Sequence, residues 1–99
     1  MIEKQFTPKR TICRVTFKVP GEWAQNEVSL VGDFNEWDPG VHHLKKDNGY
    51  WQTLVRLKPD RTYRFKYLVD GEIWQNDDQA DGYEMNTFGT ENSVLNVGK

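Results

Sequence analysis

Two tryptophans of the chain follow aspartates beside turns, and their indole rings are well suited to binding a ligand. The segments 33–37 (DFNEW) and 70–74 (DGEIW) each place a tryptophan four residues after an aspartate that follows an apolar run. A flat indole ring packs against the C–H groups of a sugar, while a nearby charged or amide group binds the hydroxyls. Exposed rings at Trp37 and Trp74 would therefore suit a polysaccharide.

The surroundings of Trp37 predict that its ring is exposed. Asn35 and Glu36 precede it and residues 38–40 (DPG) follow it, so its neighbours are polar and form turns. Phe34 is the better candidate for the buried anchor of this loop. Trp51 differs from Trp37, because it lies on the alternating apolar face of a strand-like run and is predicted to be core.

The orientation of Trp74 depends on the register of a predicted hairpin. A two-residue loop over residues 70–71 places Tyr67 opposite Trp74 and turns the indole ring toward the core. A three-residue loop over residues 70–72 places Leu68 opposite Trp74 instead. The indole ring then lies on the outer face of the sheet.

We prefer the three-residue loop, because it places Ile73 opposite Val69 and is expected to bury Ile73 beside this other apolar residue. In this register Trp74 shares the outer face with Lys66. An aromatic ring near a lysine on an exposed sheet face is an arrangement that fits a sugar polymer.

Alternating apolar residues predict an all-β fold that positions these rings. Strands are expected over residues 11–19, 27–32, 50–57, 63–69, 73–74 and 93–97. Turn signals separate them about every 8 to 12 residues, which indicates a β-sandwich or a small barrel. The polar stretch 75–92 is long for a loop, so it suggests a functional loop or one more irregular strand. The predicted core consists of Val15, Phe17, Leu30, Phe34, Trp51, Val55, Phe65 and Tyr67.

Three stretches of the sequence resemble carbohydrate-binding module family 48. They are residues 28–37 (VSLVGDFNEW), residues 63–71 (YRFKYLVDG) with Trp74, and residues 88–95 (FGTENSVL). This family is the glycogen-binding domain of the AMP-activated protein kinase β subunit and the early-set, or isoamylase N-terminal, domain of branching and debranching enzymes. The resemblance runs from about residue 10 to residue 97, and the stretch 74–81 is more similar to small stand-alone bacterial members.

The resemblance implies an immunoglobulin-like β-sandwich that binds helical α-1,4-glucans, such as glycogen, starch or maltooligosaccharides, without catalysis. Carried over to this sequence, the residues implied to bind the glucan are Trp37, Lys66, Trp74, Phe88, Thr90 and Asn92. The chain departs from the kinase-type pattern at Phe88, where that module has leucine. It also has one extra residue, Ile73, which a three-residue hairpin loop would absorb.

Composition limits the other classes of function. The chain has 99 residues, which fits one domain over residues 1–99, and its single cysteine excludes an intramolecular disulfide. No stretch has the length and apolarity of a signal peptide or a membrane span, so we expect a cytoplasmic protein without a membrane partner. The formal net charge of −2 fits a neutral partner better than nucleic acid. We expect no cofactor.

Three alternatives are weighed against glucan binding. Glycoside hydrolysis needs two carboxylates about 5 to 9.5 Å apart in a cleft, whereas the candidate carboxylates lie beside turn residues, so no catalytic residues are expected. The adjacent pair His42-His43 is interpreted as a solvated loop rather than a metal site. Nucleic-acid stacking is disfavoured because Phe65 and Tyr67 face away from Lys66. The remaining alternative is a protein-interaction or accessory module of a glycogen-metabolising, glycoside hydrolase family 13-type enzyme, which is also the candidate protein partner.

Overall fold

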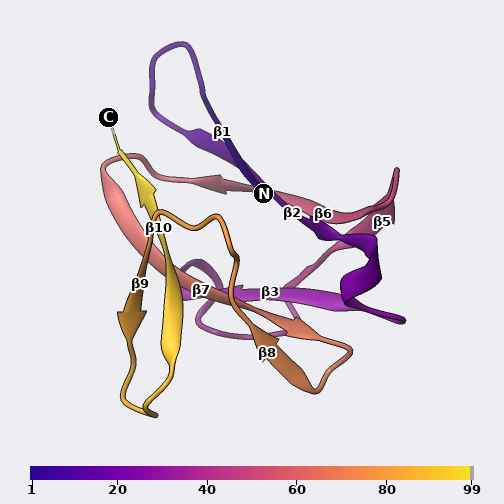
Figure 1. The fold of residues 1–99 in the computed structure, drawn as a ribbon. Coiled ribbons are helices and arrows are strands. Elements are labelled where there is room, and N and C mark those ends of the chain that lie inside the picture. The colour runs from indigo at the N-terminus through magenta and orange to yellow at the C-terminus, as the bar shows by residue number, and fades with distance from the viewer. Residues whose placement is uncertain (99) are drawn as a thin grey trace.

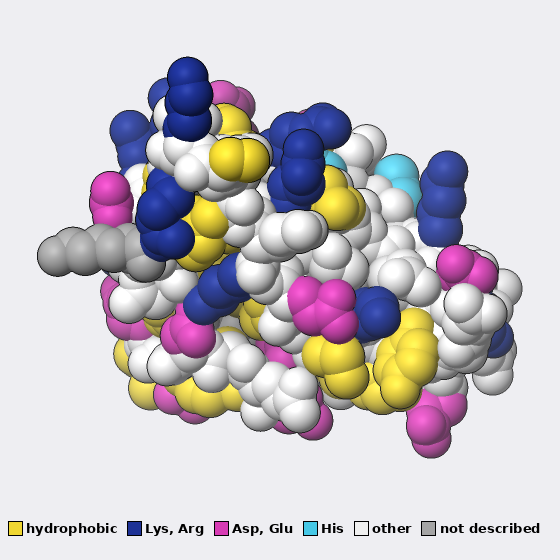
Figure 2. Space-filling model, turned by 90° about the horizontal axis from the view of Figure 1, so that it is seen from above, with side chains coloured by type: hydrophobic (Ala, Val, Ile, Leu, Met, Phe, Trp, Pro, Cys, Tyr) yellow, Lys and Arg dark blue, Asp and Glu magenta, His cyan; other side chains and the backbone are white. Residues whose placement is uncertain are grey.

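The computed structural model describes residues 1–98, and its strands form two antiparallel sheets packed face to face (Figure 1). The first sheet has four strands in the order β1 (Ile2–Phe6), β2 (Cys13–Pro20), β6 (Tyr50–Leu57) and β5 (Lys45–Asp47). Many of the basic side chains lie on its outer face (Figure 2). The chain has an immunoglobulin-like β-sandwich fold, as the sequence predicts.

The second sheet has six strands and is built around the long central strand β7 (Arg61–Val69). Its order is β4 (His42–His43), β3 (Val28–Gly32), β7, β10 (Glu91–Val97) and β9 (Gly82–Met85), and β8 (Ile73–Gln75) also pairs with β7. Strands β8 and β10 occupy the same edge of β7, since β10 pairs with residues 61–65 and β8 with residues 67–69. Two short 3₁₀ helices, η1 (Gly21–Trp23) and η2 (Asp33–Asn35), lie in the connections.

The core lies between the sheets and is rich in aromatic rings. The rings of Phe17 and Phe65 meet edge to face with centroids 5.2 Å apart, which favours close packing between the two layers. Trp51 is 8% exposed, and its indole N–H donates to the Gly21 carbonyl at 3.1 Å. All but one of the predicted core residues are buried. Phe34 is the exception: it is half-buried and packs against the core from η2.

Three parts of the chain differ from the sequence interpretation. Residues 2–6 form strand β1 on β2 and residues 45–47 form strand β5 on β6, although no strand was expected at either place. His42-His43 is not a solvated loop, because its two residues pair with β3 as the short strand β4. The stretch 75–92 contains strand β9, which is the second of the two alternatives that its length suggests. No helix within residues 1–98 is long and apolar enough to span a membrane.

Candidate functional site

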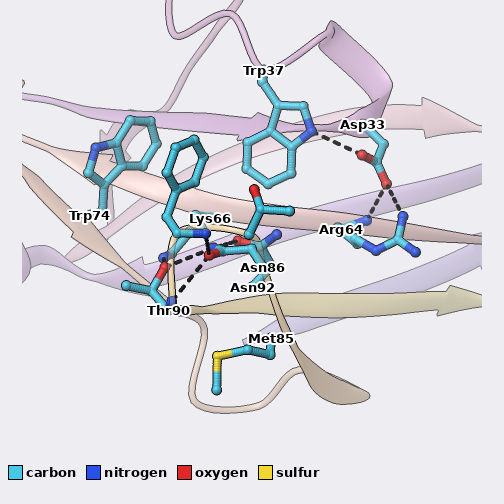
Figure 3. A pocket seen from close by; sticks show the side chains of 11 residues that line it. Asp33, Trp37, Arg64, Lys66, Trp74, Met85, Asn86, Thr90 and Asn92 are labelled. Atoms are coloured by element: carbon cyan, nitrogen blue, oxygen red, sulfur yellow. Dashed lines mark hydrogen bonds and ion pairs between the residues drawn. The ribbon is translucent and has the colours of Figure 1, made fainter.

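A groove on the outer face of the second sheet contains every residue that the sequence predicts for sugar binding. Its volume is about 840 Å³. The groove lies where β7, the β7–β8 hairpin and the β9–β10 hairpin meet (Figure 3). It is lined by Asp33, Trp37, Arg64, Lys66, Trp74, Met85, Asn86, Thr87, Phe88, Thr90 and Asn92. The fold therefore brings together the six predicted side chains from four separate segments of the sequence.

The β7–β8 hairpin places Trp74 in this groove. Leu68 pairs with Trp74 and Val69 with Ile73, so the loop spans residues 70–72 and the preferred register is confirmed. Trp74 is 49% exposed. The reason given for that register is wrong, because Ile73 is 57% exposed. Strand β8 pairs only with β7 at the sheet edge, so Ile73 does not reach the core even though Val69 does.

Asp70 anchors this hairpin to the loop before β3. Its carboxylate accepts backbone N–H groups from Gln25 at 3.1 Å, Asn26 at 2.7 Å and Glu27 at 3.0 Å. These hydrogen bonds, led by that from Glu27, hold the pKa of Asp70 below its ordinary value, because they stabilise the charged form. The turn itself needs two residues of positive φ, which are Asp70 at 51° and Gly71 at 70°.

The loop that carries Trp37 is organised by the buried amide of Asn35. Its Oδ1 accepts the Gly32 N–H at 3.0 Å, and its Nδ2 donates to the Leu30 carbonyl at 2.8 Å and to His42 Nδ1 at 2.9 Å. Burial lowers the pKa of His42, which suits a neutral ring accepting this bond. Beyond the amide, Glu36 and Trp37 both have positive φ, at 56° and 60°. The loop therefore has one well-defined shape.

Gly32 allows this loop to lie directly on β7. A Cβ atom at this position would stand 2.5 Å from the Arg64 carbonyl oxygen and 2.8 Å from the Phe65 Cβ. Any side chain would therefore push the loop away from the strand. The absence of a side chain thus sets how closely Trp37 approaches the groove.

Asp33 fixes the indole ring of Trp37. Asp33 Oδ1 accepts the Trp37 indole N–H at 3.0 Å, and Oδ2 accepts the Arg64 backbone N–H at 2.8 Å (Figure 3). Trp37 is half-buried, so it is less exposed than its polar neighbours predict. The carboxylate ties the ring to β7 and leaves its face toward the groove.

Arg64 closes one end of the groove between two carboxylates. Its Nε donates to Glu84 at 2.9 Å, and its Nη1 lies 3.6 Å from Asp33 Oδ2. The hydrogen bond to Glu84, and then the two negative charges, raise the pKa of Arg64. Its positive charge is therefore balanced locally. Sequence analysis did not select Asp33, Arg64 or Glu84 for the site, because their pairing depends on the register of three strands.

The loop between β9 and β10 forms the wall opposite Trp37, and Asn86 organises it. Asn86 Oδ1 accepts backbone N–H groups from Phe88 at 2.9 Å and Thr90 at 3.1 Å. Its Nδ2 donates to Thr90 Oγ1 at 2.8 Å and to Asn92 Oδ1 at 3.0 Å. Sequence analysis missed Asn86, although an asparagine three residues before Gly89 is typical of a turn that the side chain stabilises.

The predicted residues of this wall have different surroundings. Phe88 is 90% exposed near the tip of the loop. Lys66 extends from β7 toward the loop and donates to Thr90 Oγ1 at 3.3 Å. Asn92 is buried and accepts from Asn86, so its carbonyl oxygen supports the loop. Phe88, Lys66 and Thr90 are therefore the members best placed to meet a ligand from this side.

The chemistry of the groove is that of a binding surface. Two indole rings, one from the loop after β3 and one from strand β8, lie on the same side of the sheet, with the amide and hydroxyl groups of the β9–β10 loop beside them (Figure 3). Asp33 is the one carboxylate among the lining residues, and both of its oxygens already accept hydrogen bonds. Within residues 1–98, no group of three or more His, Cys, Asp or Glu side chains is arranged to hold a metal ion. A β-sandwich with such a groove has room for a ligand on its sheet surface, and the side chains of the groove, rather than the fold, decide which ligand that is.

Comparison with known proteins identifies the family. The family model for the glycogen recognition site of AMP-activated protein kinase matches residues 14–99. The chain belongs to this family and is a carbohydrate-binding module.

Curated relatives are glucan-branching enzymes. The chain is 40% identical over 65 residues to the 1,4-alpha-glucan branching enzyme GlgB of Deinococcus radiodurans, which covers 62% of this chain and 9% of the relative. It is 38% identical over 72 residues to the GlgB of Lactobacillus acidophilus, covering 71% of this chain and 9% of the relative. For the 1,4-alpha-glucan-branching enzyme of Rhizophagus irregularis the identity is 48% over 40 residues, covering 37% and 6%. The chain therefore spans less than a tenth of these three relatives.

Proposed function

We propose that this module binds α-1,4-glucans in the groove without catalysing a reaction on them. The observation that carries this proposal is the convergence of Trp37, from the loop after β3, and Trp74, from strand β8, on one open groove. The rings lie on the same outer face as Lys66, as stacking on successive parts of one sugar chain requires. Membership of the glycogen-recognition family supports the same ligand class.

The polar groups of the groove supply the orientation that stacking alone lacks. The Lys66 ammonium group and the Thr90 hydroxyl group lie 3.3 Å apart, so both can reach hydroxyls of one sugar unit. Phe88 offers an exposed apolar ring from the tip of the β9–β10 loop. Asn92 completes the set, and Asn86, which donates to both Asn92 and Thr90, keeps the two side chains in place.

Absence of turnover is part of the proposal. Glycoside hydrolysis ordinarily uses two carboxyl groups, one of which must give a proton to the leaving oxygen. Among the residues lining the groove, Asp33 alone carries a carboxylate, and it is committed to Trp37 and Arg64. We expect no release of reducing sugar from glycogen, and the branching-enzyme relatives suggest an accessory role beside a glycogen-metabolising enzyme.

Native gel electrophoresis with glycogen in the gel tests the binding. The wild-type chain should be retarded, with a dissociation constant for maltooligosaccharides between about 1 μM and 1 mM. The double variant Trp37→Ala/Trp74→Ala should migrate as it does without glycogen. Tyr50→Ala is the matched control, because Tyr50 is an exposed aromatic residue on the opposite sheet.

Two outcomes contradict the proposal. One is equal retardation of the wild type and the double variant, and the other is reducing-sugar release that a single carboxylate substitution abolishes. Binding should also change little between low and moderate salt, because a neutral glucan has no condensed counterions to release. A steep salt dependence would point to an anionic ligand instead.

A further inference from the structure

Two arginines lie directly opposite each other on the outer face of the first sheet. The register of β2 and β6 pairs Arg14 with Arg56, and both side chains are exposed. Opposed side chains on neighbouring antiparallel strands have Cβ atoms about 4.5 to 5.5 Å apart, and like charges in that position destabilise the pair. This arrangement is unfavourable for an isolated sheet.

Nothing within residues 1–98 neutralises this arginine pair. None of the ion pairs between described residues includes Arg14 or Arg56, whereas Lys18 on the same face lies 3.8 Å from Glu3. Lys45 on β5 also faces outward, opposite Gln52. Figure 2 looks onto this side and shows basic side chains gathered beside exposed apolar ones.

Apolar groups accompany the arginines. Leu54 lies next to Arg56 along the outward face of β6 and is 49% exposed, and Tyr50 is exposed further along the same strand. Arginine and tyrosine are enriched at protein interfaces, and an exposed leucine beside them provides area that a partner can cover. Each guanidinium group can also bind a carboxylate through two parallel hydrogen bonds.

We propose that the outer face of the β1-β2-β6-β5 sheet is a docking surface for an acidic segment of a partner protein. Carboxylates of a partner placed between Arg14 and Arg56 would be attracted to both guanidinium groups and would offset the repulsion between them. They would supply the negative charge that the exposed arginine pair lacks. A second copy of this chain docked through the same face would bring its arginines against those of the first copy, so the two copies would repel each other. A nucleic acid would meet a chain with a net charge of −2 and acidic side chains, Glu3 and Asp47, at the margins of the face.

The docking surface and the groove lie on opposite outer faces of the sandwich. Arg14 and Arg56 belong to the first sheet, whereas Trp74 and Lys66 face outward from the second. One molecule can therefore hold a glucan and an acidic partner at the same time. The proposal does not depend on glucan binding, so the two can fail separately.

The test uses poly-L-glutamate as the probe and the full chain as the receptor. Fluorescent poly-L-glutamate should bind the wild type at low salt and bind Arg14→Gln/Arg56→Gln about tenfold more weakly, as expected for two exposed ion pairs. The charge-matched control Lys58→Gln/Arg61→Gln removes two exposed basic side chains at the turn into β7 and should bind like the wild type. Both variants should retain glycogen binding, and wild type held on glycogen resin should still capture the probe.

A thermal melt adds a second readout. Because Arg14 and Arg56 repel each other, Arg56→Gln should melt at the same temperature as the wild type or higher at low salt, and poly-L-glutamate should raise the melting temperature of the wild type more than that of the variant. Equal probe binding by wild type and the double variant overturns the proposal. So does tighter binding of duplex DNA than of poly-L-glutamate, or self-association that Arg14→Gln/Arg56→Gln abolishes.

Discussion

Trp51 on the first sheet and Trp74 on the second have the same side chain, but their surroundings give it two different roles. Trp51 is covered by the opposite sheet, donates its N–H to a backbone carbonyl and is 8% exposed. Trp74 lies on a three-residue edge strand and keeps 49% of its surface exposed. The first ring holds the layers together, whereas the second is held in place by a hairpin. An indole ring therefore supports the fold only where another element covers it.

The largest effect is expected from Trp51→Ala. Removing a buried aromatic side chain leaves a cavity between the sheets and should lower the free energy of unfolding by about 3 to 5 kcal/mol. Urea denaturation followed by fluorescence measures this loss. The folded fraction of the variant should still be retarded by glycogen, and loss of binding without loss of stability would erase the contrast between the two rings.

Trp74→Ala should show the reverse pattern. Loss of one stacked ring should weaken maltooligosaccharide binding about tenfold, or about 1.4 kcal/mol, with little change in the melting temperature. Trp37→Ala should weaken binding equally but also cost some stability, because this ring is half-buried. Isothermal titration and thermal melts on both variants sharpen the comparison. A Trp74→Ala protein that unfolds but binds normally when folded would contradict it.

Asp33→Asn tests whether the ring of Trp37 must be held. The single amide oxygen of an asparagine can accept a hydrogen bond from the Trp37 indole N–H or from the Arg64 backbone N–H. The amide nitrogen is a donor, so it cannot accept the second of these bonds. Losing one such hydrogen bond should cost about 1 kcal/mol. Because the ring of Trp37 is then held less firmly, we expect this loss to appear as weaker glucan binding. Glu84→Gln is the control, since it removes the other negative charge beside Arg64 and leaves the indole contact intact. Equal effects of both variants would mean that Arg64, rather than Trp37, is what Asp33 supports.

The smallest effect concerns acid stability of the hairpin that carries Trp74. The pKa of Asp70 is lower in the folded chain, so its stabilising contribution is present above the unfolded pKa of about 3.9 and is lost as pH falls through the folded value. Asp70→Asn should therefore melt below the wild type at pH 7, and the difference should narrow at pH 3. A constant difference across that range would show that the charge of Asp70 plays no part.

Local sequence patterns predict the apolar face of a strand and the position of turns well. They predict poorly whether another part of the fold buries a given side chain. The alternation over β2, β6 and β7 places the core correctly, whereas the turn residues leave two registers of β7 and β8 open, of which the preferred one is confirmed. The sequence predicts a buried Ile73 and an exposed Trp37, whereas Ile73 is exposed and Trp37 is half-buried. Both outcomes depend on whether other elements of the fold cover the side chain. Asp33 and Asn86 were missed for a related reason, since their partners come together only when strands distant in sequence pair.

The backbone at Trp37 has a consequence for the thermodynamics of ligand capture. A bulky residue at φ 60° is sparsely populated in flexible chains, and holding it there costs on the order of 1 to 3 kcal/mol. That cost is met during folding, when the Asn35 amide and the Asp33 carboxylate fix the loop. Association with a ligand then loses little conformational entropy at this ring, because the ring is already ordered. Among the groove's side chains, the preorganised Trp37 should therefore lose little conformational entropy on binding, whereas the solvent-exposed Phe88 should lose more.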